Sequence, residues 1–413
     1  MPRGDLIELE LTEIVYGGNA FGRYDGKAVF VPYSLPGERV EVRLVDDRKR
    51  YAVGEVVRVL TPSPERVTPP CEYFGPGKCG GCQWQHIDYP AQLVYKEKIV
   101  RDQLARFAGL RDAVIYPTIP SPDPWAYRSH ATLHVTGDGR LGYVATDGRS
   151  ILPIDNCTII RPELLELLRS LSPEDIAGAR RVRLQAGSAS DDLLLVATDT
   201  SDPQDEQTSP PSPDVRPTED ERVVTAENAN VSYTVYGRTF QVTGGSFFQV
   251  NLPQATTLVE LMLRRLDLKG DERVLDLYAG VGLFAAFLAA EVRQVTAIEN
   301  SPLAARDAQV NLAPFGNVLY VNDTVENALP KLSGRFHAAV IDPPRSGMGP
   351  RALAALLEHR PGRIVYVSCD PSSLARDVKA LLDAGYTFVD AQPVDMFPQT
   401  YHVETVALLE LVS

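Results

Sequence analysis

A cysteine at the end of a strand-like run is the first candidate for chemistry in this chain. Cys369 follows the apolar run 364–367 and Ser368, and it precedes Asp370 and Pro371. The run predicts a buried parallel strand, and ligands of open α/β sheets bind beyond the carboxyl ends of the strands. A lone cysteine is more often a buried structural residue, because a reactive thiolate needs a special environment. Other parts of the sequence must therefore decide between the two roles.

A glycine turn further upstream predicts a nucleoside site. Gly280 and Gly282 lie where a strand passes into a helix, and Glu299 ends the following strand. Glycines let the backbone approach a ligand at a helix start, and an acid about 20 residues later can hold ribose hydroxyls. The turn indicates an adenosine-containing ligand. Both NAD and S-adenosylmethionine fit, because Gly280, Gly282 and Ala285 also match a dinucleotide turn.

The fourth strand of this region ends in a proline motif. Asp342 is followed by two prolines and Arg345. In methyltransferases that act on exocyclic amines, an aromatic residue follows the two prolines and stacks on the base. Arg345 in that position disfavours methylation of an amine.

Cys369 suits a different target, carbon 5 of a pyrimidine. A thiolate that adds to carbon 6 makes carbon 5 nucleophilic toward a methyl sulfonium, which is covalent catalysis. A base must then remove the proton from carbon 5. RNA cytosine enzymes of this kind carry a second cysteine beside the proline motif. This sequence has none there, which favours uracil.

The other four cysteines form a candidate metal site: Cys71, Cys79, Cys82 and Cys157. In a cytosolic protein such a set indicates a metal or catalysis before disulfides. Tetrahedral zinc and an iron–sulfur cluster both fit, with His86 as another possible ligand. A redox pair of Cys79 and Cys82 is a third interpretation.

The composition bounds the class of protein. The chain has 413 residues, which suggests two or three domains, and a net charge of −13. An acidic total does not exclude a nucleic-acid partner, because binding depends on local patches. No apolar run approaches the ~20 residues of a membrane span, and the N-terminus lacks a signal-peptide core. We expect a cytoplasmic protein, with no membrane and no protein partner implied.

Residues 1–62 predict a small β-barrel of the oligonucleotide-binding type. Short alternating strands are separated by tight turns such as Gly17-Gly18 and Asp25-Gly26. Such barrels bind RNA through exposed aromatic and basic residues. The candidates are Phe21, Arg23, Tyr24, Arg48, Lys49, Arg50 and Tyr51.

The rest of the chain divides into two further predicted domains. Residues 63–238 contain the four-cysteine set, a helix over 91–107 and several strands, and their proline-rich acidic stretch 199–222 predicts a disordered insertion. In 239–413, strands alternate with helices and end in an antiparallel hairpin. This pattern predicts an α/β domain with a doubly wound, mostly parallel sheet.

Taken together, these motifs resemble the RNA uracil-5-methyltransferases. The likeness is strongest to the branch with an N-terminal TRAM barrel and a [4Fe-4S] cluster, and it covers nearly the whole chain. The motifs that carry it are the four cysteines, 246–251 (SFFQVN), 276–282 (DLYAGVG), 342–345 (DPPR), 368–371 (SCDP) and 402–405 (HVET). The implied fold is a Rossmann-like class I methyltransferase domain after an OB-like TRAM barrel and a β-rich cluster domain.

The resemblance also implies residue roles. Cys369 is the nucleophile and Glu404 the base. The S-adenosylmethionine site is implied to contain Gln249, Tyr278, Gly280, Glu299, Asp323 and Asp342. The four cysteines are implied to hold [4Fe-4S], although seven residues separate Cys71 from Cys79, where this branch has five.

Several alternatives remain beside these roles. Gln249 could cap a helix, Asp342 could stabilise a turn, and Glu404 could face solvent. The resemblance favours ribosomal RNA as substrate, specifically 23S rRNA, with transfer RNA as the alternative. The rival classes are a non-catalytic RNA-binding or assembly factor and an NAD-linked redox enzyme. Retention of both Cys369 and Glu404 argues against a simple binding protein.

Overall fold

The N-terminal barrel is a six-stranded sheet in a computed structural model that describes residues 3–198 and 229–412. Its strand order is β1-β5-β6-β4-β3-β2, with only β4 and β6 parallel. Alternation buries one face of each strand, for example Ile7 and Leu9 of β1. The strands are β1 (Leu6–Glu10), β2 (Glu13–Ile14), β3 (Ala20–Tyr24), β4 (Lys27–Val31), β5 (Arg39–Asp47) and β6 (Tyr51–Thr61).

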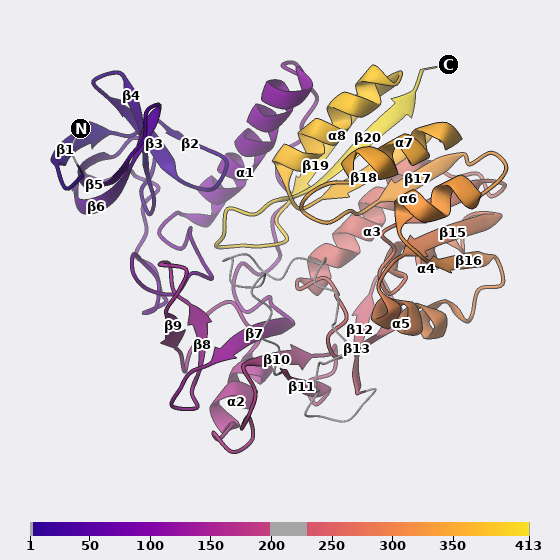
Figure 1. Cartoon of the computed structure of the whole chain (residues 1–413), viewed down its shortest axis with the longest axis horizontal. Coiled ribbons are helices and arrows are strands. Elements are labelled where there is room, and N and C mark those ends of the chain that lie inside the picture. The colour runs from indigo at the N-terminus through magenta and orange to yellow at the C-terminus, as the bar shows by residue number, and fades with distance from the viewer. Residues whose placement is uncertain (1–2, 199–228, 413) are drawn as a thin grey trace.

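A long helix joins the barrel to the rest of the molecule. Helix α1 (Tyr89–Gln103) continues into a π-helical turn, η1 (Leu104–Ala108), and ends at Gly109 with φ +74°. Tyr95 and Ile99 of α1 complete the core of the barrel. Val100 packs against the C-terminal sheet. The predicted helix is confirmed, and it lies between the two bodies that it connects (Figure 1).

The central region is built on a five-stranded antiparallel sheet with the order β11-β10-β7-β8-β9. Helix α2 (Pro162–Ser170) packs on it through Leu164 and Leu168. The predicted strands of this region are confirmed, whereas the acidic stretch 199–222 lies outside the described residues. The strands are β7 (His130–Val135), β8 (Leu141–Val144), β9 (Ile151–Pro153), β10 (Arg181–Ala186) and β11 (Leu193–Thr198), followed by the hairpin β12 (Asn230–Val235) and β13 (Arg238–Thr243).

The C-terminal sheet has seven strands in the order β16-β15-β14-β17-β18-β20-β19. Its first five strands are parallel, and β20 runs antiparallel to both β18 and β19. The prediction of a doubly wound sheet that ends in an antiparallel hairpin is therefore confirmed. The strands are β14 (Arg273–Leu277), β15 (Gln294–Glu299), β16 (Val318–Asn322), β17 (Ala338–Ile341), β18 (Arg363–Ser368), β19 (Tyr386–Val394) and β20 (Glu404–Leu411).

Helices cover both faces of this sheet, which makes the domain a three-layer α/β structure (Figure 1). One layer contains α3 (Leu252–Leu266), α4 (Leu283–Leu288) and α5 (Pro302–Leu312). The other contains α6 (Val325–Ala328), the short η3 (Leu329–Lys331), α7 (Gly349–His359) and α8 (Pro371–Asp383). Since both faces are covered, strands such as β17 are apolar throughout.

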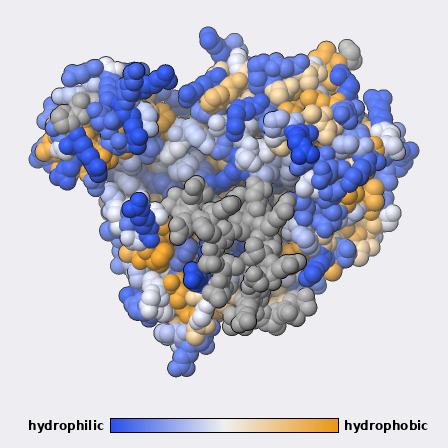
Figure 2. Space-filling model, in the orientation of Figure 1, coloured by the Kyte–Doolittle hydropathy of each residue, from blue (hydrophilic) through white to orange (hydrophobic). Residues whose placement is uncertain are grey.

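The barrel projects from the rest of the molecule. Figure 2 shows a notch between it and the larger body, with predominantly hydrophilic residues on the visible face of the barrel. None of the helices in the described part of the chain is long and apolar enough to cross a membrane.

Candidate active site

Cys369 occupies the sharp bend between β18 and α8. The strand ends at Ser368, and the Asp370 side chain accepts hydrogen bonds from the backbone N–H of Ser372 (3.0 Å) and Ser373 (2.7 Å). Asp370 is thus the N-cap of α8, with Pro371 in its first turn. These local preferences stop the strand and leave Cys369 at its carboxyl end.

Glu404 begins β20 beside Cys369. Ser368 pairs with Thr405 in the antiparallel register, so the residues beyond them, Cys369 and Glu404, are neighbours at the same end of the sheet. Glu404 is 3% exposed, and no donor in the described part of the chain reaches its Oε1. The alternative of a solvent-facing Glu404 is therefore wrong.

The electrostatics of this pair favour neutral forms. Burial raises the pKa of Cys369, and the negative charge of Glu404 raises it further, while Arg345 opposes the shift. Burial, followed by repulsion from Asp342, raises the pKa of Glu404 well above its usual value. A carboxylate with a raised pKa is a stronger base, which suits proton removal near neutral pH.

A cavity of about 270 Å³ opens beside Cys369. Arg345 and His402 line this cavity and lie against each other. The distance from Arg345 Nη2 to each imidazole nitrogen of His402 is 3.4 Å. Burial and the Arg345 charge lower the pKa of His402, so its imidazole is neutral. The lining residues are Tyr16, Ile99, Arg345, Cys369, Asp370, Pro371, Tyr401, His402 and Val403, the last of which directly precedes Glu404.

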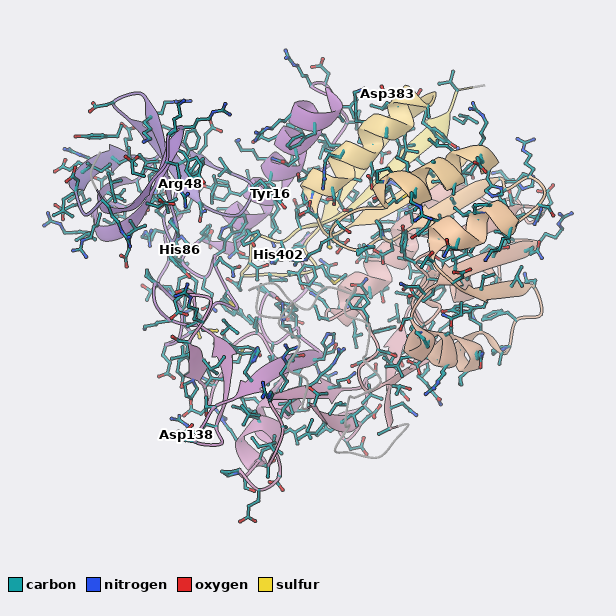
Figure 3. The ribbon with its side chains drawn as sticks, in the orientation of Figure 1. Tyr16, Arg48, His86, Asp138, Asp383 and His402 are labelled. Carbon is teal, nitrogen blue, oxygen red and sulfur yellow. The ribbon has the colours of Figure 1, made fainter. Side chains whose placement is uncertain are left out.

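Three of these residues have polar side chains that could contact a substrate, and the sequence analysis missed them: Tyr16, Arg345 and His402. Arg345 and His402 stood inside quoted motifs, so their positions beside Asp342 and Glu404 were a signal that was available. No local sequence signal pointed to Tyr16, because it belongs to the barrel and lies 354 positions along the chain from its hydrogen-bond partner Asp370. Figure 3 shows Tyr16 and His402 near the junction of the barrel and the larger body.

The nucleoside-site candidates gather at the ends of four adjacent parallel strands. The backbone N–H of Asp342 donates to the Leu277 carbonyl (3.2 Å), and that of Asp323 donates to the Glu299 carbonyl (3.1 Å). These bonds align the ends of β14, β15, β16 and β17. Tyr278, with φ +64°, turns the chain immediately after β14. The structure thus brings Tyr278, Glu299, Asp323 and Asp342 to one edge.

Two candidates are bonded to other groups of the protein. Glu299 accepts from the backbone N–H of Gly280 (3.0 Å) and of Ser301 (2.8 Å). Asp323 forms an ion pair with Lys331 (2.7 Å), which lowers the pKa of the carboxyl. Gly280 adopts φ +54°, and no other atom of the described residues lies within 4 Å of the position that a Cβ would occupy. The turn is therefore open to a ligand.

Asp342 and the buried Asp276 carry strongly perturbed carboxyls. Burial, and next the charge of Glu299, raises the pKa of Asp342 to about 7. Burial raises the pKa of Asp276 well above its usual value, with Asp342 adding to the shift. Acids pushed together in this way are typical of a functional site, and a cation nearby would relieve the repulsion.

Gln249 lies between β13 and α3 and is 6% exposed. The helix cap is the next-but-one residue, Asn251, whose side chain accepts from the Gln254 N–H. The capping alternative for Gln249 is therefore wrong. Ser246 anchors the segment by donating to Asp307 of α5 (2.6 Å).

The four remaining cysteines line a single cavity of about 40 Å³. Arg128 and Tyr143 also face it, whereas His86 does not and instead packs against Phe74. Among residues 3–198 and 229–412, no three His, Cys, Asp or Glu side chains converge closely enough for a single metal ion. Four thiols that face one cavity form a donor set that both tetrahedral zinc and an iron–sulfur cluster use.

The segment after Cys82 is tied to the loop between β19 and β20. The Gln399 carbonyl accepts from the backbone N–H of Gln83 (3.1 Å) and of Trp84 (2.9 Å). Tyr127 donates its hydroxyl to the Pro398 carbonyl (3.1 Å). The cysteine region thus supports the loop that leads into His402 and Glu404.

The three-layer α/β domain, with acids and a cysteine at the carboxyl edge of its sheet, has the fold of the class I methyltransferases. The TRAM domain model matches residues 3–57, and the tRNA (Uracil-5-)-methyltransferase model matches residues 331–412. An uncharacterized RNA methyltransferase of Halalkalibacterium halodurans is 33% identical over 99% of this chain and 98% of its own length. The Streptomyces coelicolor counterpart is 35% identical over 98% and 93%. The chain belongs to the RNA uracil-5-methyltransferase family.

A solved structure is similar over nearly the whole chain. The tRNA (uracil-54, C5)-methyltransferase of Pyrococcus abyssi, in complex with S-adenosyl-L-homocysteine, is 26% identical with a TM-score of 0.72. The match covers 97% of this chain and 100% of that one. The barrel, the central region and the C-terminal α/β domain are therefore arranged as in a known enzyme.

Proposed function

We propose that this protein transfers a methyl group from S-adenosylmethionine to carbon 5 of a uridine in RNA. The observation that carries the proposal is the antiparallel register of β18 and β20, which makes Cys369 and Glu404 neighbours. The family membership and the S-adenosyl-L-homocysteine bound to the Pyrococcus enzyme support it. An NAD-linked enzyme has no use for this pair.

The covalent step belongs to Cys369. Its thiol gives its proton to solvent, and the sulfur then forms a bond to carbon 6 of the uracil while the electrons of the carbon 5–carbon 6 double bond move toward the carbonyl oxygen at carbon 4. Arg345, whose positive charge favours the thiolate, also lines the cavity and can hold a uracil oxygen. The target base must leave its stack to enter this buried position.

Carbon 5 then takes the methyl group that S-adenosylmethionine supplies. Ionised Glu404 accepts the remaining proton from carbon 5, the double bond re-forms, and the carbon 6–sulfur bond breaks to release Cys369. Tyr278, Gly280, Glu299 and Asp342 would hold the nucleoside and the cationic sulfonium, with Gln249 and Asp323 as further contacts. Negative charge at Asp342 suits a cationic ligand.

The four-cysteine cavity is proposed to hold a [4Fe-4S] cluster with Cys71, Cys79, Cys82 and Cys157 as ligands, and zinc is the alternative. When bound, the cluster supplies a structural brace and no part of methyl transfer. The ligands surround one cavity and adjoin the loop anchored at Gln399. That position suits a structural role.

The barrel is proposed to bind the RNA outside the cavity. Rings from three adjacent strands form a row on its outer surface, with centroids 5.9 Å apart for Phe21 and Phe30 and 5.6 Å for Phe30 and Tyr51. Such rows stack on exposed bases. Arg48, labelled on the same barrel in Figure 3, forms an ion pair with Asp46 (2.7 Å).

Ribosomal RNA is the favoured substrate, because the chain combines a TRAM barrel with the four-cysteine cavity. Transfer RNA is a second candidate, since the Pyrococcus enzyme of matching architecture is named for a tRNA uridine. Unmodified 23S rRNA and tRNA transcripts, assayed side by side for methyl incorporation, distinguish the two. We expect incorporation into rRNA alone.

The mechanism is tested with RNA that contains 5-fluorouridine, in the presence of S-adenosylmethionine. Fluorine at carbon 5 blocks the final proton removal, so the wild-type protein should form a stable covalent adduct visible on a denaturing gel. Cys369→Ala should abolish the adduct. Glu404→Gln should instead accumulate adduct on ordinary RNA and lower turnover by roughly 100-fold or more. Absence of an adduct between wild-type protein and any cellular RNA pool would falsify the proposal.

A further inference from the structure

The turn between β2 and β3 of the barrel reaches the cavity beside Cys369. Tyr16 in this turn lines the cavity together with Arg345 and His402 of the C-terminal domain. Its hydroxyl donates a hydrogen bond to Asp370 Oδ2. One wall of the cavity therefore comes from the N-terminal barrel (Figure 3).

The turn is held firmly in this place. Its backbone closes through the Val15 N–H to Asn19 carbonyl bond (3.0 Å), and the Gly18 carbonyl accepts from Trp84 Nε1 (3.0 Å). A Cβ on Gly18, whose φ is +80°, would lie 2.6 Å from Tyr401 Cβ. The backbone of the turn thus packs directly on the residue before His402, which fixes Tyr16 relative to the catalytic loop.

Asp370 links this turn to the nucleophile. One oxygen of its carboxylate caps α8, and the other receives the Tyr16 hydroxyl. Asp370 is also the residue directly after Cys369. A single side chain therefore connects the barrel turn, the start of α8 and the strand end that carries the thiol.

Tyr16 nevertheless leaves part of its ring uncovered. The residue is 42% exposed, although its hydroxyl is anchored at the cavity. An exposed aromatic face at a nucleic-acid site offers a surface on which a base can stack. The cavity, at about 270 Å³, is near the lower end of small-molecule sites, roughly 300 Å³, which suits a single nucleotide.

We propose that Tyr16 is a substrate-positioning residue whose ring forms one wall of the site for the flipped pyrimidine nucleotide. The inference rests on the proposed function and adds to it. The barrel then serves two purposes: it binds RNA at a distance, and it completes the pocket in which methylation takes place. The packing of the turn against Trp84 and Tyr401 keeps the ring in place, and the hydrogen bond to Asp370 adds to it.

The test compares Tyr16→Ala and Tyr16→Phe with Tyr116→Ala. Tyr116 is a matched control, since it is 44% exposed and is not among the residues that line the cavity. For each protein, kcat and KM are measured with substrate RNA, together with the rate of adduct formation on 5-fluorouridine RNA. Binding of S-adenosylmethionine by calorimetry and Tm report on the rest of the fold.

We expect Tyr16→Ala to raise KM for RNA roughly ten-fold, the loss typical of one stacked base, and to slow adduct formation. Tyr16→Phe keeps the ring and should recover most of the affinity. S-adenosylmethionine binding and Tm should match those of Tyr116→Ala.

Three results would overturn the inference while leaving the proposed function intact. The first is a Tyr16→Ala protein that matches Tyr116→Ala in both KM and adduct rate. The second is a Tyr16→Phe protein as defective as Tyr16→Ala, which would remove the role of the ring. The third is a Tyr16→Ala protein that loses S-adenosylmethionine binding or Tm in proportion to its activity, which would mean a purely structural role. A wild-type protein without any adduct would instead overturn the proposed function itself.

Discussion

Asp342 combines a position at the strand edge with a pKa near neutrality. Burial and the charge of Glu299 raise the pKa of its carboxyl to about 7, and Asp276 behind it is buried as well. At the scale of single residues, acids held together in this way favour a positively charged ligand.

This tuning predicts a pH dependence of ligand binding. The sulfonium of S-adenosylmethionine favours ionised Asp342, so below the pKa the carboxyl must first lose a proton. Affinity should therefore increase as pH rises from 6 to 8, by up to roughly ten-fold for a single linked proton. S-adenosylhomocysteine, which lacks the positive charge at sulfur, should show a much smaller change. Calorimetric Kd values for both ligands measure the difference.

The matched variant is Asp342→Asn, which cannot ionise. In this protein the Kd of S-adenosylmethionine should be weaker and nearly independent of pH over the same range. A wild-type slope that persists in Asp342→Asn would assign the proton to another group, such as Asp276.

At the scale of elements, the loop between β19 and β20 depends on a buried ion pair. Lys96 of α1 and Asp395 at the start of the loop are both fully buried, with 2.5 Å between Nζ and Oδ1. Lys96 also donates to the Phe397 carbonyl (3.0 Å). Helix α1 thus fixes the segment that leads to His402 and Glu404.

Lys96→Met should lower the free energy of unfolding by about 3–5 kcal/mol, because it leaves the Asp395 carboxylate buried without its partner. Urea denaturation measures the change. The control is Lys98→Met on the same helix. Lys98 pairs with Asp102 at 2.5 Å but is 36% exposed, so its loss should cost less than about 1 kcal/mol. Equal losses in the two variants would contradict a dominant role for the buried pair.

Local patterns explain why many elements could be predicted from the sequence. The strand at 364–368 was evident because an apolar run ends in a helix cap and a proline, and neighbouring strands carry similar signals. Parallel strands share one carboxyl edge, so the grouping of Tyr278, Glu299 and Asp342 followed from the order of elements.

Contacts between distant segments could not be predicted in this way. Lys96 lies on α1, and although a lysine is usually exposed, this one is fully buried. Its partner is 299 positions away, and Tyr16 is 354 positions from Asp370. Only the packing of whole domains determines such pairs, because no local periodicity encodes them.

At the scale of the whole molecule, the four-cysteine cavity lies where three parts meet. Trp84, two residues after Cys82, donates its backbone N–H to Gln399 of the catalytic loop and its indole N–H to Gly18 of the barrel. A group bound by the cysteines would therefore brace the barrel turn and the catalytic loop together. In this way the proposed cluster, although far in sequence from Cys369, would stabilise the site without any redox step.

Protein purified without oxygen should consequently show broad absorbance near 400 nm (about where iron–sulfide charge transfer lies), with roughly four irons per chain. Cys157→Ser should lose most of this absorbance and lower Tm, because the brace is weakened. Cys369→Ser is the matched control: it removes the fifth cysteine, which lies outside the cavity, and should keep both the absorbance and the Tm. A colourless protein that contains one zinc per chain would mean that the four cysteines hold zinc and not the cluster. Equal Tm values for Cys157→Ser and wild type would contradict the bracing role.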